Sequence, residues 1–528
     1  MIRVLVCENL SSKGIELLSK EKGFDIDVQT GLTSGRLLEI IPQYDAMTIR
    51  SETKVTAEVL ERAERLKLVI RAGIGVDNID VKAATQRGVV VMNAPSGNII
   101  TTAEHTISML LSLCRHIPQA TASLKGGEWA KKKFTGVEVF GKTLGVLGLG
   151  NVGRVVADRA LGLHMRVMAY DPFISLEAAQ KMSVTLVGLD ELLSQADFVT
   201  VHLPLTPQTK NMINKETLSK MKKGALLVQC ARGGIVNEMD LYDALREGRL
   251  SGAALDVFEK EPPGEHPLFT LDRVICTPHL GAATDEAQMK VGIETAEQIV
   301  GFFKQGIVRN AVNLPSMSPE LRDLLRPYLE LSEKIGAFQA QLLAGDGLRA
   351  IEIEYAGEIT SHNLAPLTHA VVAGFLAEHL EKSVNQVNAL FIAQQRGIDI
   401  KATTSSHSHE FTNLISVIVR SKTSSLMISG TVFNGNEPRI VQIGKFRLEA
   451  SPEGNILYVR NWDKPGVIGH LGTILGRNKI NISRLHLSLD KGTGEALVLI
   501  NIDSPANADI LRELLALPLM IEVRQLAL

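Results

Sequence analysis

The 528-residue sequence has few of the features that mark several large classes of protein. Aromatic residues make up only 4%, with two tryptophans, so the stacking platforms that hold single-stranded nucleic acid are not expected. Lysine and arginine total 56 against 58 aspartates and glutamates, a formal net charge of −2. Such a balance gives no general attraction to a phosphate backbone or an anionic lipid surface. We therefore expect neither nucleic acid nor a membrane as a partner.

Cysteines and long apolar runs are also scarce. The four cysteines, at positions 7, 114, 230 and 276, show no C-x-x-C spacing. This argues against a zinc site and against a disulfide-bonded secreted fold. No apolar run reaches the roughly 18 residues of a membrane-spanning helix, and the N-terminus lacks the pattern of a secretory signal. These absences predict a cytoplasmic protein without a bound metal.

The apolar segments that are present predict several domains. At roughly 150 residues per domain, the length suggests three or four. Short apolar strands alternate with helical stretches, which predicts two parallel α/β units in tandem. A linker rich in proline is expected at 313–319, and the polar stretch 403–409 is predicted to be a loop. The strands of the two units are predicted at 2–7, 46–50, 66–71 and 89–93, and at 143–147, 166–170, 198–202, 226–230, 253–257 and 274–277.

The C-terminal segment has a different order of elements. Its pattern of apolar residues and turns predicts strand, helix, strand, strand, helix and strand, the order of a ferredoxin-like fold. The strands are predicted at 455–460, 481–489, 496–502 and 520–525, and the helices at 467–478 and 508–515.

Three glycines in a G-x-G-x-x-G pattern mark the start of the second α/β unit. Gly148, Gly150 and Gly153 follow a predicted strand and open a helical stretch, the context in which this pattern binds a dinucleotide. The glycines permit a tight turn, a close approach of the pyrophosphate and close packing of helix on strand. The N-terminus of the helix, at Asn151 and Val152, offers free N–H groups to the phosphates.

One acidic residue indicates which dinucleotide is bound. Asp171 ends the next strand, where a carboxylate can accept hydrogen bonds from the ribose diol. The same charge would repel a 2′-phosphate, and the following Pro172-Phe173 supplies no arginine for one. NAD is therefore predicted in preference to NADP. The alternative is a glycine-rich turn in which Asp171 caps a helix.

Three polar residues follow strand ends of the same unit, where open α/β sheets bind their ligands. Arg232 can hold a carboxylate with two parallel hydrogen bonds, and His279 can accept and return a proton near neutral pH. Glu261 can fix the tautomer of the imidazole. Together they predict hydride transfer involving a 2-hydroxy acid, although each alone could be an ordinary charge, loop residue or strand end.

These motifs, in this order, resemble those of the D-isomer-specific 2-hydroxyacid dehydrogenases over residues 1–315. The resemblance implies that Arg232 anchors the substrate carboxylate, His279 is the acid/base and Glu261 is its partner. Glu261 also argues against the related formate-oxidising branch, which carries glutamine there. Further cofactor contacts implied by the resemblance are Leu203, Cys230, Ala231, Asp256 and Gly281.

Within this family the chain resembles the long members, which oxidise D-3-phosphoglycerate at the start of L-serine synthesis and form homo-oligomers, here a dimer or a tetramer. Their substrate loops correspond to Arg50, Ser51, Lys54, Arg71 and Gly73, beside Arg232. The implied α/β architecture is a Rossmann-like NAD-binding domain (98–286) inserted in a flavodoxin-like substrate-binding domain (1–97 and 287–314). An α+β intervening domain (315–452) and a ferredoxin-like ACT regulatory domain (453–528) follow.

Several alternatives and one regulatory hypothesis accompany this interpretation. The substrate could be another D-2-hydroxy acid, such as a lactate-, glycerate- or erythronate-like molecule, or the chain could sense NAD without turnover. Lys131–Lys133 could reach a neighbouring active site or form a solvated face. In the ACT-like segment, Asp463 and Asn481 are expected to face one end of the module and to bind L-serine as an effector between paired copies. The alternative is that Asp463 only caps the following helix.

Overall fold

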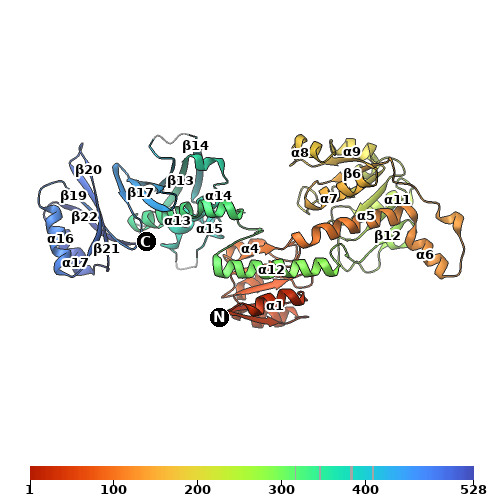
Figure 1. The fold of residues 1–528 in the computed structure, drawn as a ribbon, viewed down its shortest axis with the longest axis horizontal. Coiled ribbons are helices and arrows are strands. Elements are labelled where there is room, and N and C mark those ends of the chain that lie inside the picture. The colour runs from red at the N-terminus through yellow and green to blue at the C-terminus, as the bar shows by residue number, and fades with distance from the viewer. Residues whose placement is uncertain (316, 344–346, 381–383, 407–409) are drawn as a thin grey trace.

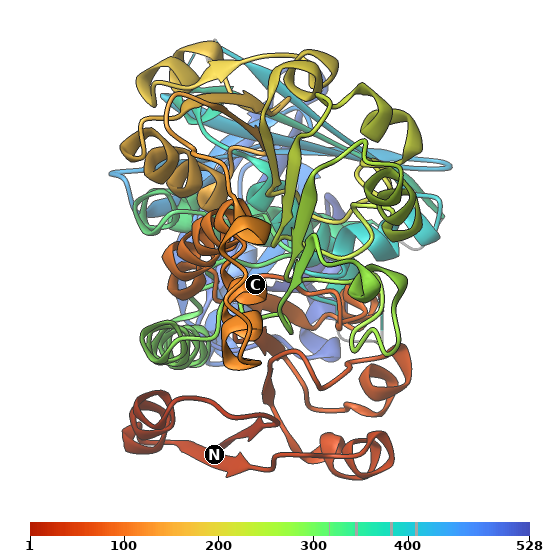
Figure 2. The same cartoon turned by 90° about the vertical axis from the view of Figure 1, so that its right-hand side faces the viewer.

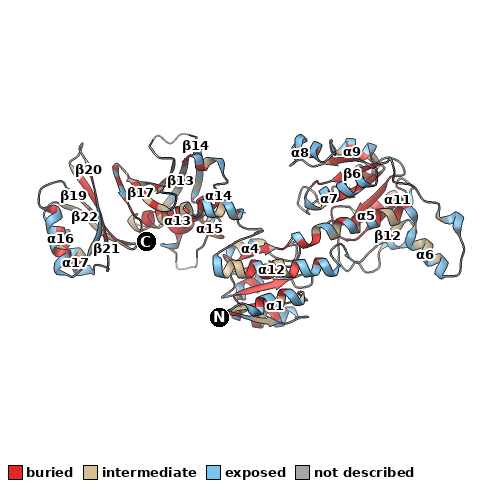
Figure 3. Cartoon of the chain, in the orientation of Figure 1, coloured by how far each residue is buried: buried red, intermediate tan, exposed pale blue. Residues whose placement is uncertain are grey.

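A computed structural model describes residues 1–315, 317–343, 347–380, 384–406 and 410–528. The described residues form four β-sheets. In Figure 1 the C-terminal sheet lies at one end of the molecule and the second sheet at the other, with the third and first sheets between them. Figure 3 shows that the strands are largely buried whereas the outer helices expose one side. No helix of the described residues is long and apolar enough to cross a membrane.

The first sheet is entirely parallel and has the order β2-β1-β3-β4-β5, which is the flavodoxin-like order. Four of its strands were predicted. The fifth, β2, was missed because it is an edge strand in which aspartates alternate with apolar residues. The elements are β1 (Ile2–Val6), α1 (Ser12–Lys20), β2 (Phe24–Val28), α2 (Ser34–Ile40), β3 (Ala46–Ile49), α3 (Ala57–Arg62), β4 (Leu68–Arg71), α4 (Val81–Gln86) and β5 (Val90–Asn93).

A helix far along the chain returns to this sheet. In α12 (Asp285–Gln305), Gly292 lies against Gly14 of α1 so closely that a Cβ on Gly14 would lie 2.5 Å from the Gly292 carbonyl oxygen. Beyond the helix, Asn313 Oδ1 accepts a hydrogen bond from the Val91 amide at 2.9 Å. The intervening chain carries the second sheet, so one α/β unit is inserted within the other (Figure 2).

The second sheet is also parallel, with the order β12-β11-β10-β9-β6-β7-β8. Counted within the unit, this is 3-2-1-4-5-6 with one further strand, the Rossmann order. Its elements are α5 (Ile99–Arg115), α6 (Ile117–Lys125), β6 (Thr143–Leu147), α7 (Asn151–Gly162), β7 (Arg166–Tyr170), α8 (Leu176–Lys181), β8 (Thr185–Leu186), α9 (Leu189–Gln195), β9 (Phe198–Val201), α10 (Lys215–Lys220), β10 (Leu226–Gln229), α11 (Glu238–Arg246), β11 (Gly252–Leu255) and β12 (Val274–Cys276).

The third sheet is mixed, with only β13 and β14 parallel. The predicted loop at 403–409 is wrong in its first part, because residues 403–405 belong to the edge strand β14, whose side chains are mostly exposed and polar. Residues 407–409 lie outside the described part. The elements are α13 (Pro319–Leu342), β13 (Leu348–Gly357), α14 (Ala365–Ala377), α15 (Ala389–Gln395), β14 (Asp399–Ser405), β15 (Asn413–Ser421), β16 (Ser425–Phe433), β17 (Glu437–Ile443) and β18 (Phe446–Ala450).

The fourth sheet is antiparallel, with the order β20-β21-β19-β22, and has the predicted βαββαβ sequence of elements. One face is covered by its two helices through Val498 and Ile500. On the other face, Tyr458, Leu497 and Leu499 join the core of the third unit. The elements are β19 (Asn455–Trp462), α16 (Val467–Arg477), β20 (Ile482–Asp490), β21 (Glu495–Ile502), α17 (Ala508–Leu515) and β22 (Met520–Ala527).

Candidate functional site

The three glycines after β6 form a cradle that fits a dinucleotide pyrophosphate. Gly148 has φ +95°, and a Cβ there would lie 2.6 Å from the His202 carbonyl oxygen. A Cβ on Gly153 would lie 2.0 Å from the Gly148 oxygen, whereas one on Gly150 would meet open space. No side chain of the described residues caps α7, which leaves its first N–H groups, including those of Asn151 and Val152, free for an anion.

Asp171 lies beside this cradle at the end of β7. Its carboxylate accepts hydrogen bonds from the Leu149 amide at 2.8 Å and the Phe173 amide at 2.9 Å. It does not cap the next helix, because Ser175 caps α8. The side chain of Leu203 packs on the same turn, with its Cδ2 atom 2.9 Å from the position of a Cβ on Gly148.

A histidine–glutamate pair lies in the loops that follow the C-terminal ends of β11 and β12. The His279 Nδ1 atom lies 2.7 Å from Glu261 Oε2, and Glu261 Oε1 accepts a hydrogen bond from the Phe258 amide at 3.0 Å. Burial alone would raise the pKa of Glu261, but these hydrogen bonds outweigh it and hold the pKa below its usual range. The pair is therefore an ionised carboxylate fixed against one ring nitrogen, which leaves Nε2 of the ring for another partner.

A buried aspartate shapes the loop that carries this imidazole. Asp256 is 0% exposed, and it accepts hydrogen bonds from Thr277 Oγ1 at 2.6 Å and from the Leu280 and Gly281 amides at 2.7 and 2.8 Å. His105 Nε2 lies 3.2 Å from the same carboxylate. The Asp256 carboxylate therefore makes its hydrogen bonds within the protein, to backbone amides and side chains of its own chain. Since the residue is fully buried, it has no surface for the direct contact with a cofactor that the resemblance implied.

A buried glutamine has the same role for the loop after β10. Gln229 is 1% exposed; its Nε2 donates to the Arg232 carbonyl at 2.8 Å, and its Oε1 accepts from the Ala231 amide at 3.2 Å. Cys230 is buried, and burial raises the pKa of its thiol to about 12. A Cβ on Gly233 would lie 1.8 Å from the Phe258 carbonyl oxygen. The arginine loop therefore packs directly against the loop that holds the glutamate.

Arg232 reaches from this loop to the first α/β unit. Its Nε donates to Asp77 Oδ2 at 3.1 Å, and a Cβ on Gly75 would lie 2.2 Å from its Nη2. The neighbouring Arg71 is largely buried, and burial, followed by the positive charges of Arg232 and Arg50, lowers its pKa to about 10. Three guanidinium groups from two α/β units thus lie within electrostatic reach of one another.

The loop after β3 completes this cationic region. Arg50 is half-buried, and Ser51 and Lys54 are exposed. Arg71 Nε donates to the Arg50 carbonyl at 3.2 Å. A Cβ on Gly73 would lie 2.7 Å from Arg71 Nη1, so a side chain there would displace the guanidinium. The structure therefore brings Arg50, Arg71, Gly73 and Arg232 together, whereas Ser51 and Lys54 are exposed on the loop beside them.

The two residues predicted to meet in the C-terminal segment do not meet within one chain. The Asp463 amide donates to the carbonyl of Gly494, just before β21, whereas the Asn481 amide donates to Asp503, just after β21. The two residues therefore lie at opposite ends of the sheet, which corrects the prediction. Nor does Asp463 cap α16, because Gly466 precedes that helix without a side-chain hydrogen bond.

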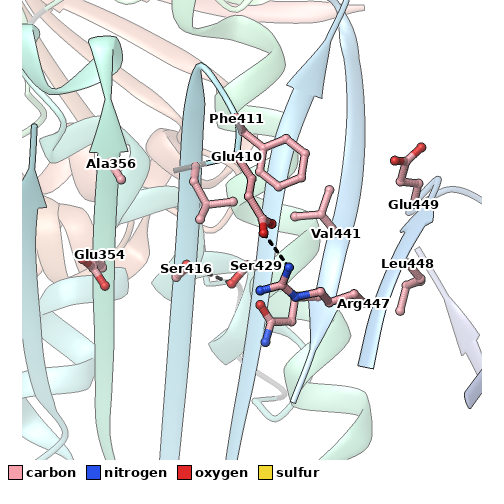
Figure 4. Close-up of a pocket in the computed structure, with 12 residues that line it drawn as sticks. Glu354, Ala356, Glu410, Phe411, Ser416, Ser429, Val441, Arg447, Leu448 and Glu449 are labelled. Carbon is pink, nitrogen blue, oxygen red and sulfur yellow. Dashed lines mark hydrogen bonds and ion pairs between the residues drawn. The ribbon is translucent and has the colours of Figure 1, made fainter. Parts of the chain in front are cut away.

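A separate hollow of about 660 Å³ lies on the open face of the third sheet (Figure 4). Three glutamates and Arg447 line it, and Arg447 pairs with Glu410 at 2.5 Å. Ser416 and Ser429 share a hydrogen bond of 2.8 Å at its floor. The excess of acid there makes it a poorer site for an anionic substrate than the region around Arg232.

Comparisons with known proteins show the family to which the chain belongs. A family model for the D-isomer specific 2-hydroxyacid dehydrogenase NAD binding domain matches residues 107–281, and one for the D-3-phosphoglycerate dehydrogenase intervening domain matches residues 324–444. The D-3-phosphoglycerate dehydrogenase of Archaeoglobus fulgidus is 44% identical over 97% of both chains. That of Bacillus subtilis is 40% identical over 99% of both. The chain belongs to the D-3-phosphoglycerate dehydrogenase family.

Among the similar proteins of known structure, one was solved with NAD bound. A Thermus thermophilus protein, TT0316, is 34% identical, with a TM-score of 0.55 over 59% of this chain and 100% of its own. An NAD-dependent formate dehydrogenase from Staphylococcus aureus, solved with NAD, is 29% identical, with a TM-score of 0.54 over 60% of this chain and 100% of its own. As a member of the D-3-phosphoglycerate dehydrogenase family, the chain is an NAD-dependent 2-hydroxyacid dehydrogenase.

The sequence motifs did not point to Gln229 or Glu8 as residues that hold these loops, and the resemblance gave Asp256 a different role, as a cofactor contact. Gln229 and Asp256 end or follow buried strands, and Glu8 follows β1. Each is a polar side chain at most 9% exposed, and a buried polar group must find hydrogen-bond partners. A polar residue at the end of an apolar strand was the available signal.

Proposed function

We propose that this chain oxidises D-3-phosphoglycerate to 3-phosphohydroxypyruvate with NAD, the first step of L-serine biosynthesis. The observation that carries the proposal is the convergence of Arg50, Arg71 and Arg232, of which the described structure pairs only Arg232 with an acid, Asp77. A substrate with both a carboxylate and a phosphate would use such a cluster, whereas a small monoanionic acid needs one guanidinium. The names of the relatives support the same substrate.

The pair of His279 and Glu261 supplies the proton chemistry of this reaction. NAD, when bound in the glycine cradle, would supply the acceptor for the hydride that leaves C2 of the substrate. In the proposal, Arg232 exchanges Asp77 for the substrate carboxylate, and His279 Nε2 takes the hydroxyl proton as the C2–O bond becomes a carbonyl. Glu261 holds the opposite ring nitrogen and stabilises the imidazolium that forms.

We assign the parts of the chain accordingly. Residues 98–286 hold NAD, through the glycine cradle, Asp171, Leu203 and the backbone around Cys230, Ala231 and Gly281. Residues 1–97 and 287–314 bind the substrate's anionic end through Arg50, Ser51, Lys54, Arg71 and Gly73. Residues 315–452 form the intervening domain. Residues 453–528 form an ACT regulatory domain, which their ferredoxin-like fold supports.

We further propose that L-serine binds between the C-terminal domains of two copies and inhibits. The edge strand β20 exposes Leu485, Leu487 and Leu489 on one side, and its free backbone can pair with a second β20. Antiparallel pairing of the two edges would bring the partner subunit's Asn481 to the end of the sheet that carries Asp463. The binding groups then come from two chains.

A second apolar surface supports a homo-oligomer. No residue of helix α6 is buried (Figure 3). The segment that follows this helix carries Lys131–Lys133 in exposed positions. A second copy of the chain is the occupant that we propose, as in a homodimer or tetramer. The exposed apolar side chains of α6 and the segment after it are Ile117, Leu124, Trp129, Val137 and Phe140.

The decisive experiment measures NADH formation by the purified protein with a panel of D-2-hydroxy acids. D-3-phosphoglycerate should give the highest kcat/KM, well above D-glycerate and D-lactate. A preference for an unphosphorylated acid would replace the proposed substrate with a glycerate- or erythronate-like one. A lack of turnover with every acid would favour a protein that senses NAD.

A further inference from the structure

One carboxylate accepts four consecutive backbone N–H groups next to the cationic cluster. Glu8 follows β1 and is 9% exposed. Its Oε1 atom accepts from the amides of Arg50 at 2.8 Å and Thr53 at 2.9 Å. Its Oε2 atom accepts from the amides of Ser51 and Glu52, each at 3.1 Å. Hydrogen bonds to the charged form of a carboxylate are the strong ones, so this turn is held firmly.

The carbonyl side of the same turn is held as well. Asn78 Nδ2 donates to the Arg50 carbonyl at 2.8 Å and to the Thr53 carbonyl at 2.6 Å. Arg71 Nε also donates to the Arg50 carbonyl. The backbone of residues 50–53 is therefore fixed from both sides by side chains of the same α/β unit.

This arrangement decides which groups of the turn can meet a ligand. Four successive N–H groups pointing to one place form the kind of concavity that binds anions in other proteins. Here the concavity is filled by Glu8, so its amides are not available to a substrate phosphate. Contact with an anion is left to side chains, of which Arg50 is half-buried and Ser51 exposed. The negative charge also lies near enough to Arg71 to favour the charged form of that guanidinium.

We propose that Glu8 is a positioning residue of the substrate site. Its carboxylate fixes the turn 50–53, and with it Arg50 and Ser51, in the conformation that receives the anionic end of the substrate. The proposal rests on the proposed function insofar as that turn contacts the substrate. It adds a residue that itself touches neither substrate nor NAD.

The test compares Glu8→Gln with the control Glu61→Gln, which removes an exposed carboxylate from α3 of the same unit. An amide keeps the shape but sets an N–H group against the backbone N–H groups. Steady-state kinetics should give a KM for the substrate about tenfold or more higher in Glu8→Gln, with kcat changed by less than about threefold. The Kd for NADH, followed by fluorescence, should stay within about twofold of wild type. The control should match wild type in all three.

Two outcomes overturn the proposal: an unchanged KM in Glu8→Gln, or an equal loss of affinity for substrate and NADH, which would mark a general structural defect. If Glu8→Gln does not fold, Asn78→Ala loosens the turn from its carbonyl side and should raise KM in the same selective way. The assay uses the acid that the wild type prefers. A preference for an acid other than D-3-phosphoglycerate would refute the proposed function while leaving the Glu8 test intact.

Discussion

The imidazole of His279 and the carboxylate of Glu261 are joined by a 2.7 Å contact between Nδ1 and Oε2. Since the other carboxylate oxygen is held by the Phe258 amide, the glutamate cannot rotate freely and the ring is held in one orientation. The ring nitrogen that remains, Nε2, is then the atom that can exchange a proton with a substrate hydroxyl. The Phe258 amide thus fixes the Glu261 carboxylate, and the carboxylate in turn orients the His279 ring.

Removal of the imidazole tests the assignment of the acid/base. We expect His279→Ala to lower kcat by about 10²–10⁴-fold, because proton transfer by a positioned group contributes that much. The Kd for NAD should change little. Stopped-flow or steady-state NADH absorbance measures the first and fluorescence titration the second. His470→Ala, which removes an exposed imidazole on α16, should match wild type. A loss of less than about tenfold in His279→Ala would place the base elsewhere.

The pH profile tests the carboxylate. The pKa of Glu261 lies below its usual range, so the group is ionised at neutral pH, and its charge stabilises the imidazolium that forms when His279 accepts a proton. In Glu261→Gln that stabilisation is lost, and the acid limb of kcat/KM for oxidation should move to lower pH. The plateau value of kcat should fall about ten- to hundredfold, since the ring loses its fixed tautomer. An acid limb at the wild-type pH would contradict the pairing.

Cofactor choice depends on one carboxylate. Asp171→Ala should weaken NAD and narrow its advantage over NADP, because the ribose diol loses an acceptor and a 2′-phosphate is no longer repelled. Part of the NAD loss should come from the glycine turn itself, since the Asp171 carboxylate also holds the Leu149 amide. Asp171→Asn, which can still accept that bond, separates the two effects. Unchanged discrimination between NAD and NADP in both variants would refute the role.

Arg50 tests the class of substrate. If its guanidinium binds the phosphate, Arg50→Ala should raise KM for D-3-phosphoglycerate by about ten- to hundredfold. The much poorer KM for D-glycerate should stay within about threefold. Parallel kinetics with the two acids measure the difference directly. Equal effects on both acids would mean that Arg50 holds the turn or the carboxylate and not the phosphate.

Buried strands and glycine turns could be predicted from this sequence, whereas edge strands could not. Six of the seven parallel strands of the second unit were predicted from near-continuous apolar runs, with ends that differ from the observed ones by at most two residues. The two-residue edge strand β8 (Thr185–Leu186) was missed. The edge strands β2 and β14 are polar or alternating because one side of each lacks a neighbouring strand. Their sequences therefore resemble those of loops or helices.

Part of the site was hidden from the sequence for two other reasons. The hydrogen-bond partners of the Glu8 and Gln229 side chains are mostly backbone groups. Every residue carries such groups, so the sequence does not show which of them these side chains will bind. The error over Asp463 and Asn481 came from strand direction. Both residues flank strands, but β19 and β20 run parallel to each other on either side of β21. The end of one therefore lies far from the start of the other.

The same strand direction makes the regulatory hypothesis depend on a second copy of the chain. If L-serine binds where Asp463 of one chain meets the partner subunit's Asn481, its carboxylate and ammonium are held by different subunits. Serine must then bind the inhibited arrangement better than the active one. We expect Asp463→Ala to raise the serine concentration for half-inhibition by about tenfold or more without a change in KM for D-3-phosphoglycerate.

Leu487→Asp provides an independent test, because it places a charge on the exposed edge strand β20 and should oppose its pairing. Light scattering should show a smaller assembly for this variant, and serine inhibition should weaken while basal turnover is retained. Asp509→Ala, an exposed change on α17, serves as the matched control and should respond to serine like wild type. Equal inhibition of wild type and Asp463→Ala, or competition between serine and D-3-phosphoglycerate, would refute the hypothesis, since either result would move the serine site away from the C-terminal domain.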